Sequence, residues 1–176
     1  HCAQIKKLKL PSPFDQDTSR KLLVIGGGVS GMTASLEAAK AGYEVDLVEK
    51  SERLGGYTLD QYKLLPSRPP YESPQQNNTL DLVSLVENHD RISVHKSSHV
   101  SSISGHPGEF SVRLNKMGKT AKFVSGAVIL ATGSKPYDAT KLTHLGIQYE
   151  NVISSVEFEQ MAKGKNIQRK DGKPAM

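Results

Sequence analysis

Cysteine is the scarcest informative residue in this sequence of 176 residues, because only Cys2 is present. One thiol cannot form a disulfide within the chain, a redox-active dithiol pair or the four-cysteine ligand set of an iron–sulfur cluster. Tryptophan is absent as well. The sequence therefore excludes a mechanism based on paired or clustered cysteines within this chain.

Long apolar runs are also missing. No stretch of eighteen apolar residues occurs, so the sequence predicts no membrane-spanning helix. The N-terminal stretch HCAQIKKLKLPSPF is basic but lacks the apolar core of a secretory signal peptide. We therefore expect a cytoplasmic protein without direct membrane insertion, which its partners could hold at the periphery of a membrane.

The net charge of +5 comes from basic residues scattered along the chain. Nucleic-acid binding needs clustered positive charge, so we expect a solvated basic surface, open to an acidic partner but not to nucleic acid. His95 and His99 have the spacing of two metal ligands on a helix, but ISVHKSSHV is typical of a strand and a bend. We interpret both histidines as surface strand residues and expect no metal site.

The two ends of the chain indicate a piece of a longer polypeptide, because it begins at His1 rather than Met and ends in GKPAM without a closing element. The length favours one domain. Two prolines and the turn-like DQDTS make residues 1–20 an N-terminal segment and linker. We place the main domain at 21–137 and the start of a truncated remainder at 138–176.

The first regular segment reads as strand, helix and strand within residues 21–49. KLLVI and EVDLVE are short apolar runs, and strands joined by a helix are expected to be parallel. Gly42 stands where a left-handed residue commonly ends a helix. Apolar residues recur at the spacing of one helix face, and small residues line the other side. The first set is Val29, Met32, Leu36 and Ala39, and the second is Ala34, Ala38 and Ala41.

The middle of the chain predicts a long loop, a second helix and a third parallel strand. Residues 59–77 contain four prolines and read as a loop. Asn78 followed by Asp81 resembles a capping box at a helix start. RISVHK supplies the strand. The buried stripe of this helix is expected at Leu82, Val83 and Val86.

Three short runs of alternating polarity come next: HVSSIS, EFSVRL and TAKFVS. Turn residues in GHPG and NKMGK separate them, which predicts an antiparallel meander at about 98–125. GAVILATGS is almost wholly apolar, which is typical of a strand buried on both faces. The predicted fold class is α/β, a Rossmann-like parallel sheet with a three-stranded antiparallel meander.

Gly26, Gly28 and Gly31 predict a cradle for a dinucleotide. The first permits a tight turn out of the strand, the second lets a pyrophosphate approach the backbone, and the third allows close helix packing. Amides at the helix start then point at the phosphates. Glu49 ends the second strand, where a carboxylate accepts the hydroxyls of an adenosine ribose and repels the 2′-phosphate of NADP. We add its neighbour Lys50 to the candidate site.

Two further stretches bear on the choice between FAD and NAD. In EKSERLGGYT, Arg53 can offset phosphate charge and the pair Gly55–Gly56 can bring backbone close to the pyrophosphate. In AVILATGS, Thr132 and Gly133 close a strand near the point where the strand order reverses. Arg53 could instead be an ordinary surface arginine, and ATG an ordinary turn at a strand end.

These stretches together resemble the flavoprotein superfamily with two dinucleotide-binding domains. The resemblance rests on VIGGGVSGMTASLEAAKAGYEVDLVEKSERLGG and AVILATGSKPYD and covers roughly residues 20–160. Within the superfamily, SHVSSISGHPGEFSVRL and ATGSKPYDATKLTHLGIQYENVISSVEFEQM are similar to the A subunit of heterodisulfide reductases. They are also similar to related subunits of quinone-interacting membrane-bound oxidoreductase complexes.

The resemblance implies FAD, with its adenosine half in this segment. Carried over by position, the first three glycines hold the pyrophosphate, Glu49 holds the ribose, and Arg53 with the glycine pair lines the flavin side of the diphosphate. Val100 is implied to meet the adenine through its backbone, while Thr132 and Gly133 close the site. The implied partners are iron–sulfur or quinone-linked redox subunits and the remainder of the same polypeptide.

The sequence departs from the superfamily in two respects. Disulfide reductases of the lipoamide type carry a redox cysteine pair soon after the double glycine, where this chain has Tyr57-Thr58-Leu59-Asp60. The ferredoxin-like cysteine clusters of many heterodisulfide reductase A subunits are missing, as are a second glycine-rich domain and the segment that completes the flavin ring pocket. We therefore expect few protein walls around the isoalloxazine ring.

We interpret the chain as the FAD-binding portion of a redox flavoprotein that passes electrons to iron–sulfur or quinone-linked partners. The parent protein would be an FAD-dependent oxidoreductase in which the flavin carries the chemistry and the protein positions it. We assign no catalytic residue. Two alternatives stay open: a module that holds an adenine dinucleotide without turnover, and an NAD(H)-binding dehydrogenase domain. The glycine pair argues against the second, because the NAD fingerprint does not require it.

Overall fold

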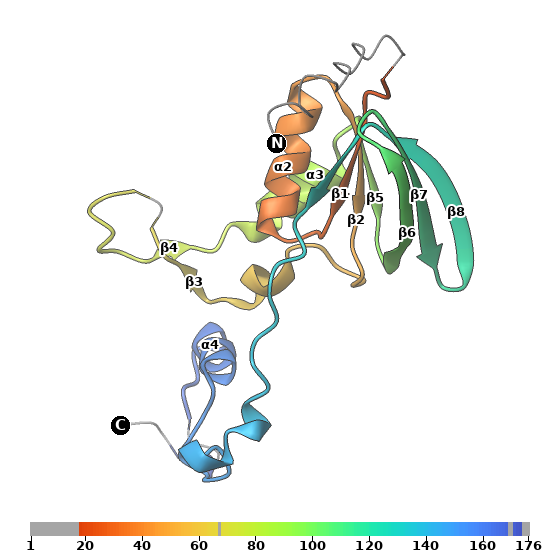
Figure 1. Cartoon of the computed structure of the whole chain (residues 1–176). Coiled ribbons are helices and arrows are strands. Elements are labelled where there is room, and N and C mark those ends of the chain that lie inside the picture. Colours follow the sequence, from red (N-terminus) through yellow and green to blue (C-terminus); the bar gives the residue numbers. More distant parts are fainter. Residues whose placement is uncertain (1–17, 67, 169–170, 174–176) are drawn as a thin grey trace, which may run out of the picture.

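The computed structural model describes residues 18–66, 68–168 and 171–173 (Figure 1). Cys2 and most of the expected linker at 1–20 lie outside the described residues. A parallel sheet forms the middle layer, two helices cover one of its faces, and an antiparallel meander covers the other. A small C-terminal unit follows the last strand of the parallel sheet. The α/β class with a meander is thus confirmed.

The central sheet has the strand order β5-β2-β1-β9, and every neighbouring pair is parallel. The chain places two strands on one side of β1 and then returns to place β9 on the other side. The strand order therefore reverses between β1 and β9, and open α/β sheets bind their ligands beyond the carboxyl ends of the strands at such a point. The strands are β1 (Lys21–Ile25), β2 (Glu44–Val48), β5 (Ile92–His95) and β9 (Ala127–Leu130).

Helix α2 (Val29–Lys40) lies on one face of this sheet with the predicted apolar stripe buried. Met32 is fully buried against a cluster that includes Val24 and Leu47. The predicted small-residue side is partly wrong, because Ala41 is exposed. The small residues that lie deepest belong instead to the stripe itself. They are Gly31 and Ser35, whose hydroxyl donates to the Gly31 carbonyl at 2.8 Å.

Helix α3 (Thr79–Glu87) begins after Asn78, as predicted, but the predicted capping box is wrong. The Asn78 side chain makes no capping hydrogen bond; the Asn77 carboxamide oxygen accepts from the Thr79 amide at 3.0 Å instead. Asn77 also donates to the carbonyls of Thr58 and Gln61, so it ties the helix start to the preceding loop. The predicted stripe packs on the sheet, with Val86 fully buried.

The segment 59–77 is mostly irregular, as predicted, but it contains a short hairpin. It begins within the 3₁₀-helix η1 (Gly56–Asp60). Strands β3 (Lys63–Leu64) and β4 (Gln75–Gln76) then pair antiparallel. Two-residue strands carry too little periodicity to be recognised in a sequence.

The predicted meander consists of β6 (Ser98–His106), β7 (Glu109–Lys116) and β8 (Lys119–Ser125), paired antiparallel in sequence order. Its inner face carries Val112 and Leu114, which pack on Leu23 and Val48 of the parallel sheet. The alternation in EFSVRL therefore reports correctly which side chains face the core. This second cluster fixes the meander against the face of the sheet that the helices leave open.

Strand β9 corrects the prediction that GAVILATGS is buried on both faces. β9 pairs only with β1 among the described strands, so it is an edge of the sheet. Its two middle residues, Val128 and Ile129, are half-buried on opposite faces, whereas Leu130 is 73% exposed. An apolar run shows that a strand can be covered, but it does not show what covers it.

A polar cluster lies between the parallel sheet and the meander. Asp46 on β2 is 3% exposed; one carboxylate oxygen lies 2.7 Å from Nε2 of His95 and the other 2.9 Å from Nζ of Lys21. The second contact is an ion pair without directed hydrogen-bond geometry. The ring of Phe123 stacks on His95 and lies below the Lys21 ammonium. His95 is therefore half-buried and paired, which corrects its interpretation as a surface residue, while His99 is exposed as expected.

The pKa of Asp46 reflects competition between burial and its partners. Burial, the largest influence, would raise the pKa of this carboxyl. The hydrogen bond with His95 and the ion pair with Lys21 together outweigh burial and hold the pKa below its usual range. Asp46 is therefore a charged residue that fastens three strands of the sheet to one another.

The C-terminal unit contains η2 (Ala139–Lys141), η3 (Thr143–Leu145) and α4 (Ser155–Lys163). Helix α4 starts with a capping box, in which Ser154 Oγ accepts from the Glu157 amide and the Glu157 carboxylate accepts from the Ser154 amide. Lys163 Nζ donates to the Leu59 carbonyl at 3.0 Å, which links this helix to η1. We did not predict α4, although Ser-x-x-Glu before an apolar pattern is a helix signal.

Candidate functional site

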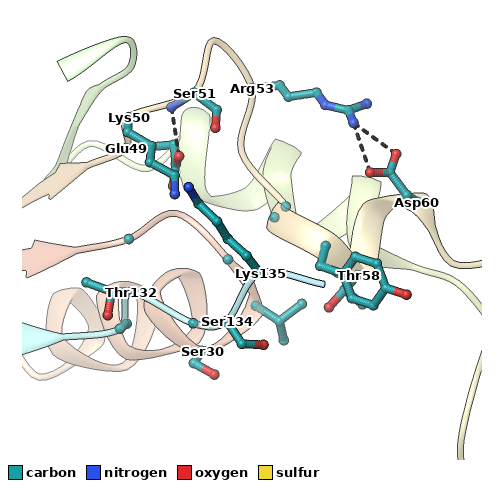
Figure 2. Close-up of a pocket in the computed structure, with 18 of the residues that line it drawn as sticks. Ser30, Glu49, Lys50, Ser51, Arg53, Thr58, Asp60, Thr132, Ser134 and Lys135 are labelled. Carbon is teal, nitrogen blue, oxygen red and sulfur yellow. Dashed lines mark hydrogen bonds and ion pairs between the residues drawn. The ribbon is translucent and has the colours of Figure 1, made fainter. Parts of the chain in front are cut away.

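A cleft of about 840 Å³ opens at the carboxyl ends of β1 and β9, where the strand order reverses (Figure 2). Four segments form its walls: the turn from β1 into α2, the residues after β2, the double glycine with η1, and the segment after β9. The structure thus brings together most of the predicted site. The predicted residues that line the cleft are Gly26, Gly28, Glu49, Lys50, Arg53, Gly55, Gly56, Thr132 and Gly133.

The turn from β1 into α2 leaves no room for side chains at two of the predicted glycines. Gly26 has φ of +111°, and a Cβ atom there would lie 2.1 Å from the carbonyl oxygen of Ala131. A Cβ atom on Gly31 would lie 1.8 Å from the carbonyl oxygen of Gly26. Gly31 does not line the cleft; it lets α2 pack against the turn itself. Both glycines therefore shape the cradle from behind.

Gly28 is different, because a Cβ atom there would meet nothing within 4 Å and would face open space. Gly28 and Gly55 form a parallel bridge, and the Gly55 amide donates to the Gly27 carbonyl at 2.8 Å. Gly56 lies so close that its Cβ atom would be 3.2 Å from the Cα atom of Gly28. The double glycine is thus stacked on the first glycine turn, and side chains on either would separate the two backbones.

Glu49 holds the glycine turn in place. The residue is 7% exposed; its Oε2 atom accepts from the Gly27 amide at 2.7 Å and its Oε1 atom accepts from the Ser51 amide at 2.8 Å. A carboxylate has about four acceptor positions, so these two bonds leave it able to accept more. A residue predicted only as a ribose ligand therefore also orients the backbone of the cradle.

Arg53 lines the cleft but already has a partner. Its Nη2 atom lies 2.9 and 3.0 Å from the two carboxylate oxygens of Asp60, and Figure 2 shows the pair at the η1 side of the cleft. The guanidinium is therefore neither an isolated surface group nor a free cation. It would have to leave Asp60 before it met a phosphate.

The segment after β9 forms the opposite wall. Thr132 and Gly133 line the cleft as predicted, with Gly133 at φ of +62°. The wall continues through Ser134 and Lys135, and Figure 2 shows the Lys135 side chain extending across the cleft toward Glu49. A strand-end turn and a cleft wall are thus the same structure here, so the two interpretations of ATG are compatible.

Val100 lies elsewhere. It is half-buried against the cluster of Leu23 and Val48 on the meander side, and it does not line the cleft. Its contact with an adenine therefore stays a prediction. The assignments of the other site residues to particular parts of a cofactor stay predictions as well.

A second cavity of about 700 Å³ adjoins the cleft. Its lining is mainly apolar and comes from the C-terminal unit, together with Tyr57 and Tyr137. Tyr57, Lys135 and Pro136 belong to the linings of both cavities, so the two spaces meet at these residues. The C-terminal unit thus supplies a wall that the sequence did not predict.

Four cleft residues escaped sequence reasoning: Tyr57, Asp60, Ser134 and Lys135. Each directly follows a recognised motif or lies within a turn of it, and that proximity was the available signal. In chemical terms the cleft combines backbone amides, one buried carboxylate and several cations. These are the groups that hold a phosphate ester joined to a sugar.

In the part of the chain that the structure describes, no helix has both the length and the apolarity needed to cross a membrane. The same residues include no group of three potential metal ligands from histidine, cysteine and acidic side chains.

Comparison with known proteins identifies relatives of this arrangement. Residues 20–167 match the family model of the pyridine nucleotide-disulphide oxidoreductases. The chain is 31% identical over 153 residues to the A subunit of the ferredoxin/F(420)H(2)-dependent CoB-CoM heterodisulfide reductase of Methanosarcina acetivorans, covering 82% of this chain and 18% of that protein. It is 34% identical over 114 residues to the second iron-sulfur A subunit of the CoB–CoM heterodisulfide reductase of Methanopyrus kandleri, covering 65% and 17%.

A solved structure shows the same fold. The thioredoxin reductase of Lactococcus lactis superposes with a TM-score of 0.52 at 20% identity, covering 67% of this chain and 37% of that one. The chain spans less than a fifth of the two heterodisulfide reductase relatives. Because the family model matches most of the chain at the residues that form the cleft, this chain belongs to the pyridine nucleotide-disulphide oxidoreductase family, as a dinucleotide-binding domain.

Proposed function

We propose that this chain binds FAD through its adenosine diphosphate half and forms the flavin-binding part of an oxidoreductase similar to the A subunits of heterodisulfide reductases. The observation that carries the proposal is the stacking of the double glycine Gly55–Gly56 on the glycine turn beside the buried Glu49. This arrangement leaves bare backbone on two sides of the cleft. A diphosphate needs such an approach from both sides.

Glu49 fits the adenosine ribose. Its two backbone bonds fix the carboxylate at the end of β2, and its remaining acceptor positions can take ribose hydroxyls. A 2′-phosphate in the same place would be repelled by the carboxylate. The cleft therefore favours FAD or NAD over NADP.

The diphosphate fits the space above Gly28. No atom lies where a Cβ of Gly28 would point, and α2 starts there with the positive end of its dipole. The bare backbone of Gly56 lies on the other side. The double glycine supports FAD over NAD, since the NAD fingerprint does not require it.

The proposed reaction class is electron transfer. FAD supplies one- and two-electron redox chemistry when bound, and this chain holds and orients it. A dithiol within this chain is excluded, because Cys2 is its only cysteine. The relatives are named as subunits of heterodisulfide reductases, one of them as an iron–sulfur subunit, which supports iron–sulfur or quinone-linked partners for this chain too.

Calorimetric titration of the full chain with FAD, ADP, NADH and NADPH tests the proposal. FAD and ADP should bind, and NADPH should bind least. Tighter binding of NADH than of FAD would support the dehydrogenase alternative and overturn the FAD proposal. Binding of FAD without any reduction by a donor in the full-length protein would support a module without turnover.

Glu49→Gln tests the ribose assignment. Loss of the charged acceptor should weaken ADP binding by about tenfold, from the usual worth of hydrogen bonds to charged groups. It should also reduce the preference for ADP over 2′-deoxy-ADP, which a merely loosened turn would not do. Glu109→Gln, at an exposed glutamate of the meander, is the matched control. An unchanged preference in Glu49→Gln would remove this residue from the ribose site.

A further inference from the structure

Three cations line the cleft, and they differ in what they are free to do. Arg53 is held by both carboxylate oxygens of Asp60. Lys50 follows directly on Glu49 and therefore stands at the ribose end. Lys135 comes from the opposite wall and makes no hydrogen bond or ion pair within the described part of the chain.

The geometry of Lys135 sets it apart from the other two. Its backbone lies where the cleft meets the second cavity, and its side chain extends back across the cleft toward Glu49 (Figure 2). It does not reach ion-pair distance of that carboxylate. The ammonium group therefore stands over the space between the wall at Gly133 and the glycine turn, where the proposed function puts the diphosphate.

We propose that Lys135, rather than Arg53, is the cation that binds the diphosphate of the dinucleotide. The inference rests on the proposed function, because it concerns the same cleft. A diphosphate carries at least two negative charges, and a lysine ammonium is a strong partner for phosphate oxygens. An unpaired ammonium loses no existing partner when the ligand arrives.

Arg53 is the natural candidate from sequence, since it precedes the double glycine and a guanidinium suits phosphates. In the structure that guanidinium would give up its paired contact with Asp60, and Asp60, which also lines the cleft, would then face the ligand as an unpaired negative charge. Removing a partner from a charge pair is unfavourable. The Arg53–Asp60 pair is therefore a structural element of the η1 side of the cleft, and Lys135 is left to neutralise the ligand.

Titration of the full chain with ADP separates these roles. Lys135→Gln should weaken ADP binding by about tenfold, the usual effect of losing one charge-assisted hydrogen bond that is partly open to solvent. Lys135→Arg should restore most of the affinity, because it keeps the charge. The preference for ADP over 2′-deoxy-ADP should not change in either variant, since the ribose contact belongs to Glu49.

The matched controls are Arg53→Gln, within the cleft, and Lys122→Gln, at an exposed lysine of β8 outside it. We expect ADP affinity within about twofold of the parent for Lys122→Gln and a smaller loss for Arg53→Gln than for Lys135→Gln. Unchanged affinity in Lys135→Gln, or a larger loss in Arg53→Gln, overturns the inference while leaving the proposed function in place. If the parent chain binds neither ADP nor FAD, the proposed function fails, and the inference fails with it.

Discussion

At the scale of single residues, Asp46 shows how a charge can be placed inside a parallel sheet. A strand covered on both faces is expected to be continuously apolar, and Asp46 interrupts EVDLV in its middle. The cost of burial is offset because β1 contributes Lys21 and β5 contributes His95 to the same carboxylate. The acid itself was visible in the sequence, but its partners come from strands whose register only the fold determines.

Asp46→Asn should lower the free energy of unfolding by about 1–3 kcal/mol near neutral pH, because it removes a buried charge and leaves Lys21 without its partner. The sign of the pH dependence follows from the lowered pKa of Asp46. Its stabilisation is complete above the pKa of the unfolded chain, about 4, and is lost as the pH falls through the lower folded value. Urea denaturation at several pH values measures the difference between parent and variant.

The matched control for this experiment is Glu44→Gln, at an exposed acid of the same strand that pairs with Arg91. Exposed pairs contribute little, so this variant should differ from the parent by less than about 1 kcal/mol. A stability difference for Asp46→Asn that stays constant from neutral to acidic pH would contradict the assigned role of the carboxylate.

At the scale of elements, the turn from β1 into α2 was the most predictable part of the chain. The glycine spacing, the apolar stripe of α2 and the acid after β2 all lie within thirty residues or so, and local rules cover such distances. Predictions failed where a distant segment decided the outcome. Asn77 took over the capping of α3 because the loop carbonyls of Thr58 and Gln61 lie beside it. Leu130 is exposed because no described strand pairs with the outer side of β9.

This turn also allows a test in which two glycines should behave differently. Gly28→Ala puts a methyl group into open space in the cleft, so the free energy of unfolding should fall by less than about 1 kcal/mol while ADP binding is lost. Gly31→Ala puts the methyl group against the Gly26 carbonyl oxygen, which has to move, so the cost should be about 2 kcal/mol or more. Thermal unfolding and ADP titration of both variants measure the two effects.

The two variants serve as controls for each other. Full ADP affinity in a well-folded Gly28→Ala variant would show that no ligand approaches this backbone. Equal stability of both variants would show that α2 does not pack on the turn as closely as the structure indicates.

At the scale of the whole molecule, the cleft joins residues that lie about a hundred positions apart in the sequence, such as Gly28 and Thr132. Only the return of the chain to the far side of β1 brings them together. That crossover is a property of the fold family, so the resemblance predicted the meeting of the two motifs while periodicity alone could not. The wall from the C-terminal unit and the second cavity depend on contacts such as Lys163 to Leu59, and no motif marks these.

A ligand that binds across these segments should stabilise the whole chain. With ligand at a hundred times its dissociation constant, mass action adds about 2.7 kcal/mol to the free energy of unfolding. For a chain of this size, that corresponds to a rise of about 5–10 °C in the unfolding midpoint. Because the cleft holds the adenosine diphosphate half, ADP should give most of the rise that FAD gives, and riboflavin should give little. Thermal scans at matched saturation measure the three shifts, and a larger rise with riboflavin than with ADP would place the binding energy in the second cavity instead of at the glycine turn.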